Sequence, residues 1–200
     1  PISLIVYFYL NRKRLTTASK IWLVFTSLFF YSWWNINYLP IILISILFNY
    51  TVASAMIDYN RSKRKYFRKK SLLQIGLIFN IGLLVYFKYM DFFLSNVNTF
   101  FATDIGLLNL ALPLAISFFT LQQIAFLIDS YDGLVKKNKF LDYSIFVTFF
   151  PQLIAGPIVH HKEMMPQFSR VRNKVINYKN IALGLFIFSI GLFKKVVVAD

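Results

Sequence analysis

Long apolar runs separated by short basic blocks dominate this sequence and limit what the chain can fold into. The 200 residues are 58% hydrophobic and carry 22 Lys and Arg against 8 Asp and Glu. The basic residues gather at 12–20, 61–70, 136–139 and 162–179, and the runs between these blocks are almost free of charge. This alternation is typical of transmembrane helices joined by basic loops.

The apolar runs divide into segments of the length that a membrane requires. A helix needs about 20 apolar residues to cross the hydrocarbon core. The run 21–57 is too long for one span, and we divide it before Pro40, because proline favours the start of a helix. Trp33 and Trp34 precede this turn, where interfacial aromatic residues are common. The predicted spans are 1–10 (truncated), 20–35, 39–57, 72–90, 112–131 and 181–198.

The positions of the basic blocks support this count of spans. The blocks at 11–20, 61–70 and 136–139 are separated by two predicted spans each, so all three lie on one side of the membrane. The positive-inside rule makes that side cytoplasmic. Between them, residues 91–109 mix phenylalanine with polar residues and suit a surface loop or a helix in the membrane interface. The predicted fold class is all-α, a polytopic transmembrane helix bundle with all 200 residues in one domain.

One apolar segment, at about 141–157, is too short to cross the membrane and is interrupted by Pro151 and Gln152. A full crossing would place the basic stretch 162–179 outside the cell, whereas a re-entrant segment keeps it cytoplasmic. Non-helical backbone at membrane depth is tolerated only where it is buried in protein or lines a cavity. We therefore predict a re-entrant segment that forms the wall of a functional cavity.

Several classes of function are excluded or disfavoured by composition. The absence of cysteine excludes disulfides and cysteine zinc sites in this stretch, and no G-x-G occurs, so dinucleotide and phosphate-loop motifs are absent. Two adjacent histidines supply too few ligands for a metal cage, and we predict no metal site. The basic blocks are wedged between spans rather than gathered on one soluble face. We therefore expect them to contact anionic lipid headgroups and not nucleic acid.

Polar residues inside the apolar runs are the candidates for a functional role. Gln122 and Asp129 are seven residues apart and share a helix face. Polar groups in a membrane either join helices by hydrogen bonds or line a pathway, and both interpretations remain open. In the stretch 151–163, His160 and Glu163 could pair on a helix. Histidine can serve as an acid or base near neutral pH, but a purely structural role for this histidine is also possible. The candidates are Gln122, Gln123, Asp129, Pro151, Gln152, Gly156, Pro157, His160, His161 and Glu163.

Two stretches are more specific than these physical patterns. Residues 112–129 (LPLAISFFTLQQIAFLID) and 149–168 (FFPQLIAGPIVHHKEMMPQF) resemble the membrane-bound O-acyltransferase family, and within it the bacterial alginate O-acetylation branch. Residues 29–34 and 192–200 are also similar to that branch, so the resemblance covers nearly the whole chain. The D-alanyl transfer proteins of teichoic acid are more distant relatives.

The resemblance implies a membrane-embedded O-acyltransferase of the bacterial cytoplasmic membrane. It implies a helix bundle with a funnel, through which an acyl group, here acetyl, moves toward an extracytoplasmic polysaccharide. The donor is expected to be acyl-CoA or another cytoplasmic acyl thioester, with no tightly bound cofactor, and a periplasmic acyltransferase partner often completes the reaction.

The family's catalytic histidine lies in its C-terminal half, and nothing in these residues matches it. We therefore expect this chain to be the N-terminal part of a longer enzyme, with the catalytic residue beyond residue 200. Two alternatives remain. One is D-alanyl transfer to teichoic acid, with a small carrier protein as donor. The other is a non-enzymatic transporter or channel built from broken helices.

Overall fold

The computed structural model describes residues 2–59, 69–135, 139–153 and 161–199, in which every regular element is a helix and no strand occurs. This confirms the predicted all-α fold class. The described elements are α1 (Ile2–Arg12), α2 (Thr16–Trp34), η1 (Ile36–Tyr38), α3 (Leu39–Tyr59), α4 (Lys69–Leu84), η2 (Val85–Tyr89), α5 (Met90–Phe101), α6 (Ile116–Tyr131), α7 (Phe140–Thr148), α8 (Phe150–Leu153), α9 (His161–Ser169), η3 (Val171–Lys174), α10 (Tyr178–Phe193) and η4 (Lys194–Ala199).

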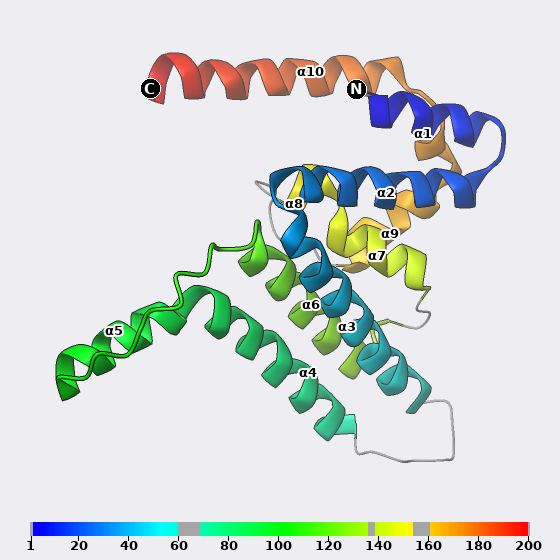
Figure 1. The fold of residues 1–200 in the computed structure, drawn as a ribbon. Helices are drawn as coiled ribbons and strands as arrows, with labels where there is room; N and C mark the ends of the chain where they lie inside the picture. The colour runs from blue at the N-terminus through cyan, green and yellow to red at the C-terminus, as the bar shows by residue number, and fades with distance from the viewer. Residues whose placement is uncertain (1, 60–68, 136–138, 154–160, 200) are drawn as a thin grey trace.

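The core of the molecule lies where α3, α4 and α6 pack side by side, with α2 and α7 against them (Figure 1). Ile42, Met56 and Phe126 are completely buried there. Helix α1 packs on the outer side of α2. The apolar residues of α3 do not form one stripe, because lipid and neighbouring helices both accept apolar side chains.

Three of the described helical runs are long and apolar enough to cross a membrane: Ile36–Tyr59, Lys69–Phe101 and Tyr178–Val198. They cover the spans that we predict at 39–57, 72–90 and 181–198. Helices α2 and α6, which correspond to the predicted spans 20–35 and 112–131, fall outside this set. Helix α6 has 16 residues, which at about 1.5 Å per residue reach roughly 24 Å, so its crossing of the bilayer stays a prediction.

The helix that begins at Lys69 is longer than the predicted span 72–90 and continues to Phe101. A π-helical turn, η2, separates α4 from α5, and the chain bends there (Figure 1). Residues 102–115 then run back along α5, where Asp91 Oδ1 accepts a bond from Leu108 N at 2.8 Å and Asn98 Nδ2 donates to Ile105 O at 2.8 Å. The stretch 91–109 is therefore part helix and part extended loop.

The segment that we predict as re-entrant, 141–157, is broken within the structure. Helix α7 ends at Thr148, Phe149 takes a non-helical conformation, and the short α8 follows up to Leu153. Residues 154–157 lie outside the described part of the chain, so the re-entrant path itself stays a prediction. The break places Pro151 and Gln152 within α8, which packs beside α2.

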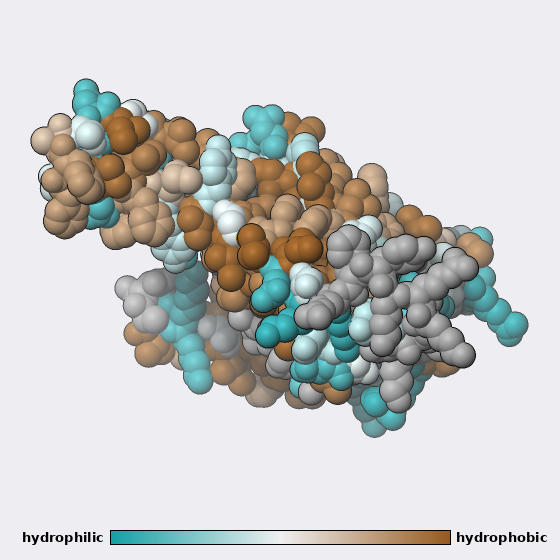
Figure 2. Space-filling view, turned by 90° about the horizontal axis from the view of Figure 1, so that it is seen from below, coloured by the Kyte–Doolittle hydropathy of each residue, from teal (hydrophilic) through white to brown (hydrophobic). Residues whose placement is uncertain are grey.

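Helix α10 stands apart from the core, next to α1 (Figure 1), and none of its residues is buried. Apolar side chains are exposed elsewhere too. The face seen in Figure 2 is largely hydrophobic, including the projecting end formed by α5, where Phe92 and Phe100 are exposed. Exposed apolar surface on this scale is expected of a protein surrounded by lipid or by further protein.

Candidate functional site

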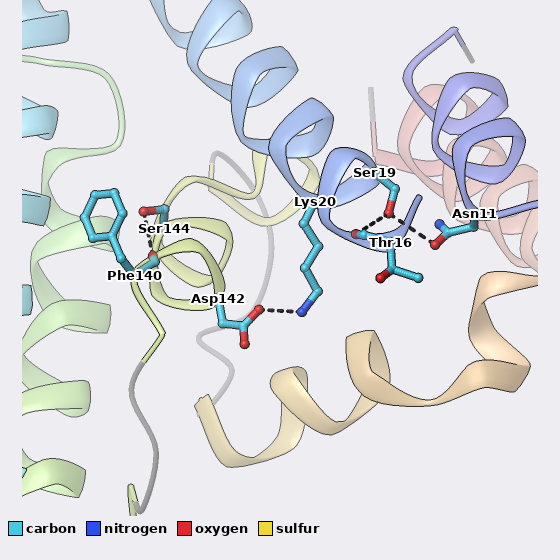
Figure 3. A network of polar contacts seen from close by, with 7 residues as sticks. All are labelled: Asn11, Thr16, Ser19, Lys20, Phe140, Asp142 and Ser144. Atoms are coloured by element: carbon cyan, nitrogen blue, oxygen red, sulfur yellow. Dashed lines mark hydrogen bonds and ion pairs between the residues drawn. The ribbon is translucent and has the colours of Figure 1, made fainter. Parts of the chain in front are cut away.

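An ion pair joins α2 to α7 at one end of the bundle. Lys20 Nζ lies 2.5 Å from Asp142 Oδ1, and both side chains are partly exposed (Figure 3). Beside it, Ser19 Oγ donates to Asn11 Oδ1 at 3.1 Å and so links α2 to α1. These polar contacts fix three helices relative to one another on the side where the sequence places cytoplasmic basic residues.

His161, the first residue of α9, lies against the core face of α6 and α7. Its ring makes edge contacts with Phe126 at 4.8 Å and Phe146 at 5.3 Å between ring centroids. Burial lowers the pKa of His161, and the negative charges of Asp129 and Asp142 act in the opposite direction. Two predicted candidates, Asp129 and His161, thus lie close enough for the charge of Asp129 to act on the pKa of His161.

A cavity of about 470 Å³ lies next to the broken segment. Its walls mix aromatic and aliphatic side chains with the amides of Gln152, Gln167 and Asn173. Such a mixture is typical of small-molecule sites, in which a few polar groups orient a mainly apolar ligand. The lining residues are Ser3, Leu4, Tyr7, Leu23, Phe149, Phe150, Pro151, Gln152, Met164, Gln167, Phe168 and Asn173. Part of the segment predicted as re-entrant thus borders a cavity, and its role as the wall of a functional cavity stays a prediction.

A second feature is a buried polar cluster between α3, α4 and α6. Gln123 Oε1 accepts hydrogen bonds from Asn49 Nδ2 and, at 3.1 Å, from Ser45 Oγ. Asn80 Nδ2 donates to Asn49 Oδ1 at 2.6 Å and to the Gly76 carbonyl at 2.7 Å. All four side chains are at most 1% exposed. For Gln123, the hydrogen bonds between helices favour the role of joining the bundle over that of lining a pathway.

Other buried polar atoms on α6 have no hydrogen-bond partner among the described residues. They are Thr120 Oγ1, Gln122 Oε1 and Gln123 Nε2. An unpaired buried polar group costs on the order of 1–3 kcal/mol. For Gln122, therefore, the interpretation as a pathway residue remains open.

The remaining candidates are not gathered at one point. Glu163 is exposed on α9, and Gly156, Pro157 and His160 lie outside the described residues, so a pairing of His160 with Glu163 stays a prediction. No group of three metal-ligating side chains occurs among the residues that the structure describes.

Sequence reasoning missed several residues of these sites. Asn49 and Asn80 lie inside predicted spans, and their polar character there is a signal that could have identified them. Lys20 and Asp142 are 122 residues apart, and no local pattern connects them. Tyr7 and Asn173 join the cavity only because α1 and η3 fold against α8 and α9.

Comparison with known proteins shows which families and individual proteins have a similar sequence. The sequence model of the membrane-bound O-acyltransferase family matches residues 134–200. The chain is 48% identical, over its whole length, to a peptidoglycan O-acetyltransferase of Helicobacter pylori, of which it covers 42%. It is 30% identical to a probable alginate O-acetylase AlgI of Pseudomonas aeruginosa and 31% identical to that of Pseudomonas putida, covering 38% and 40% of these relatives. No solved structure matches the chain.

The chain therefore spans about two fifths of the length of the curated relatives that it matches. The residues of the cavity, of the polar cluster and around His161 lie within the stretch that aligns with these relatives.

Proposed function

Since the chain belongs to the membrane-bound O-acyltransferase family, we propose that it is part of an enzyme that transfers an acetyl group to an extracytoplasmic polysaccharide. The observation that carries this proposal is the 48% identity, across the entire chain, to a peptidoglycan O-acetyltransferase. The proposed donor is a cytoplasmic thioester such as acetyl-CoA. A periplasmic acyltransferase partner completes the transfer.

The reaction sets requirements that the fold can serve. A hydroxyl group, either of the sugar or of an intermediate carrier of the acetyl group, attacks the thioester carbonyl. The new C–O bond forms as the C–S bond breaks, and the thiol leaves with the proton of the hydroxyl. A site for this step must admit an acyl group and exclude water. The cavity beside Gln152 supports the proposal because aromatic walls and a few amides meet there. The residue that acts at the carbonyl is proposed to lie beyond residue 200.

The names of the relatives guide the choice of acceptor. One relative is a peptidoglycan O-acetyltransferase and others are probable alginate O-acetylases, and both acceptors are glycans with free hydroxyl groups. Because the identity is higher to the former, we propose peptidoglycan as the first acceptor to test. The proposed location is the bacterial cytoplasmic membrane, where a donor on one face and a glycan on the other are both accessible.

A deletion strain of the full-length gene tests the proposal. Peptidoglycan and extracellular polysaccharide are purified, and the acetate released by mild base is measured. We expect loss of the ester-linked acetate in one polymer and its return when the full-length gene is supplied on a plasmid.

Two results would point elsewhere. Unchanged acetate together with loss of D-alanyl esters would favour D-alanyl transfer to teichoic acid. If both esters persist while uptake or export of a solute is lost, the chain belongs to a transporter.

A further inference from the structure

A groove between α1 and the start of α10 combines apolar walls with a basic end. It has a volume of about 850 Å³, which lies within the roughly 300–1,000 Å³ range of small-molecule sites. Leu4 lines both this groove and the cavity beside Gln152, whereas neither residue of the ion pair and none of the four residues of the polar cluster lines the groove. The lining residues are Leu4, Ile5, Phe8, Tyr9, Asn11, Arg12, Arg14, Thr16, Val171, Lys174, Val175, Ile176, Tyr178 and Ile181.

The basic end, as we call it here, consists of three cationic lining side chains, and within the described part of the chain no ion pair joins them to a carboxylate. Arg12, Arg14 and Lys174 line the groove, and none of its described lining residues is acidic. Within the described part of the chain, the ion pair is formed instead by Lys20 and Asp142. Three cations that line one groove attract an anion, and guanidinium groups match the geometry of phosphate oxygens.

The backbone holds the two arginines in place. The turn between α1 and α2 puts Arg14 in the left-handed region, with φ of 61°. Its N–H donates to the Asn11 carbonyl at 2.9 Å, and the Asn11 side chain accepts a hydrogen bond from Ser19 on α2 (Figure 3). The basic end is therefore built on a fixed turn, which reduces the entropy lost when a ligand binds.

The walls of the groove are aliphatic and aromatic side chains that remain exposed. Leu4 is 54% exposed, Ile5 65% and Val175 64%. They extend from the basic end along α1 and the start of α10. An alkyl chain would cover these side chains, whereas a small polar anion would leave them bare.

We propose that this groove binds one anionic phospholipid of the cytoplasmic leaflet. The headgroup phosphate lies on Arg12, Arg14 and Lys174, and an acyl chain lies along the walls formed by α1 and α10. The positions of the charges agree with this leaflet, because the sequence places the blocks at 11–20 and 162–179 on the cytoplasmic side. An acetyl thioester would engage the basic end, but its two-carbon acyl group cannot fill the apolar walls. The proposal does not depend on acyl transfer.

Lipid retention by the full-length protein tests the proposal. The protein is placed in nanodiscs of equal phosphatidylglycerol and phosphatidylethanolamine, extracted, and its bound lipid is identified by native mass spectrometry. We expect wild-type protein to retain phosphatidylglycerol preferentially. The triple variant R12Q/R14Q/K174Q should lower the ratio of retained phosphatidylglycerol to phosphatidylethanolamine by about 10-fold or more, because each cation near the surface favours anionic lipid.

Two further variants separate the groove from general charge. The matched control K70Q/K139Q/R170Q removes three exposed cations of the same predicted face that do not line the groove, and it should keep the wild-type ratio. Val175→Trp leaves every charge intact but fills the groove, and it should lose bound phosphatidylglycerol. If the triple variant fails to fold, Val175→Trp carries the test.

Any one of four lipid-retention results would overturn the proposal. These are equal retention of both lipids by wild-type protein, an unchanged ratio in R12Q/R14Q/K174Q, an equal fall in the control, or full retention in Val175→Trp. Displacement of phosphatidylglycerol by added acetyl-CoA would also overturn it, by assigning the groove to the donor.

Discussion

Asn80 shows how a single polar side chain holds helices together inside a lipid-facing protein. It is 1% exposed on α4, and it exchanges hydrogen bonds with Asn49 of α3 while bonding the Gly76 carbonyl. Asn80→Ala should lower the free energy of unfolding by about 1 kcal/mol, since interhelical bonds in membranes average roughly 0.6 and reach about 1.7 kcal/mol. Denaturant unfolding of the full-length protein in detergent micelles measures this.

The control for that prediction is Asn96→Ala. Asn96 Nδ2 donates to the Phe92 carbonyl of its own helix, near the surface, and makes no contact with another helix among the described hydrogen bonds. An equal loss of stability in both variants would show that removing any asparagine from a helix has this effect, and that the contact between Asn80 and Asn49 contributes nothing further. A double-mutant cycle with Asn49→Ala should give a coupling energy of the same size as the interhelical bond.

His161 provides a prediction about pH. Burial lowers its pKa below the ordinary 6.5, so the unfolded chain binds this proton more tightly than the folded protein. The stability contributed by neutral His161 is therefore complete above about pH 6.5 and is lost as pH falls through the lower pKa of the folded state. His161→Phe keeps a ring beside Phe126 and Phe146 without a titrating group. Its melting temperature should fall less steeply than that of wild type as the pH is lowered below about 6.5. Parallel profiles would contradict the prediction.

At the scale of elements, Gly76 sets how closely α4 approaches α6. A Cβ atom at this position would lie 2.6 Å from Cδ1 of the completely buried Leu127, whereas nothing lies within 4 Å of a Cβ at Gly82 on the same helix. Gly76→Ala should destabilise the protein by about 1–3 kcal/mol through overpacking. Gly82→Ala should be neutral or stabilising by up to about 1 kcal/mol, because alanine favours a helix.

Thermal unfolding of the two glycine variants, side by side, checks this contrast. The double variant Gly76→Ala/Leu127→Ala should be less destabilised than the sum of the two single variants, because the shorter side chain at the buried position 127 makes room for the added methyl group. If both alanine variants have the same stability, the close approach of α4 and α6 at Gly76 is not a packing constraint.

The elements also show what the sequence could and could not reveal. The apolar length of 39–57 predicts α3 closely, because a buried or lipid-facing helix needs a minimum run of apolar residues. The end of the helix at Phe101 was not predictable, because Asp91 and Asn98 look like surface residues until residues 102–115 fold back on them. Gln122 and Gln123 are adjacent in sequence, yet only Gln123 joins α3, which depends on the rotation of α6 within the bundle.

Over the whole molecule, contacts between distant segments join residues that the charge pattern assigns to the same side of the membrane. Lys20 and Asp142, both on the predicted cytoplasmic side, form an ion pair. On the predicted outer side, Tyr38 donates its hydroxyl hydrogen bond to the Ala111 carbonyl at 2.5 Å. Figure 1 shows α1 and the start of α10 at the same end of the molecule. A topology with 162–179 outside would separate the groups that form the basic end of the α1–α10 groove.

Chemical labelling of single cysteines turns this arrangement into a prediction about topology. The 200 residues contain no cysteine, so a full-length background free of cysteine needs no change within them. Cysteines at Asn37 and Thr103, both exposed, should react in intact spheroplasts with a maleimide that cannot cross the membrane. Cysteines at Lys139 and Arg172, also exposed, should react only after the membrane is permeabilised. Labelling at Arg172 in intact spheroplasts would mean that the segment 141–157 crosses the bilayer, and the re-entrant path would be wrong.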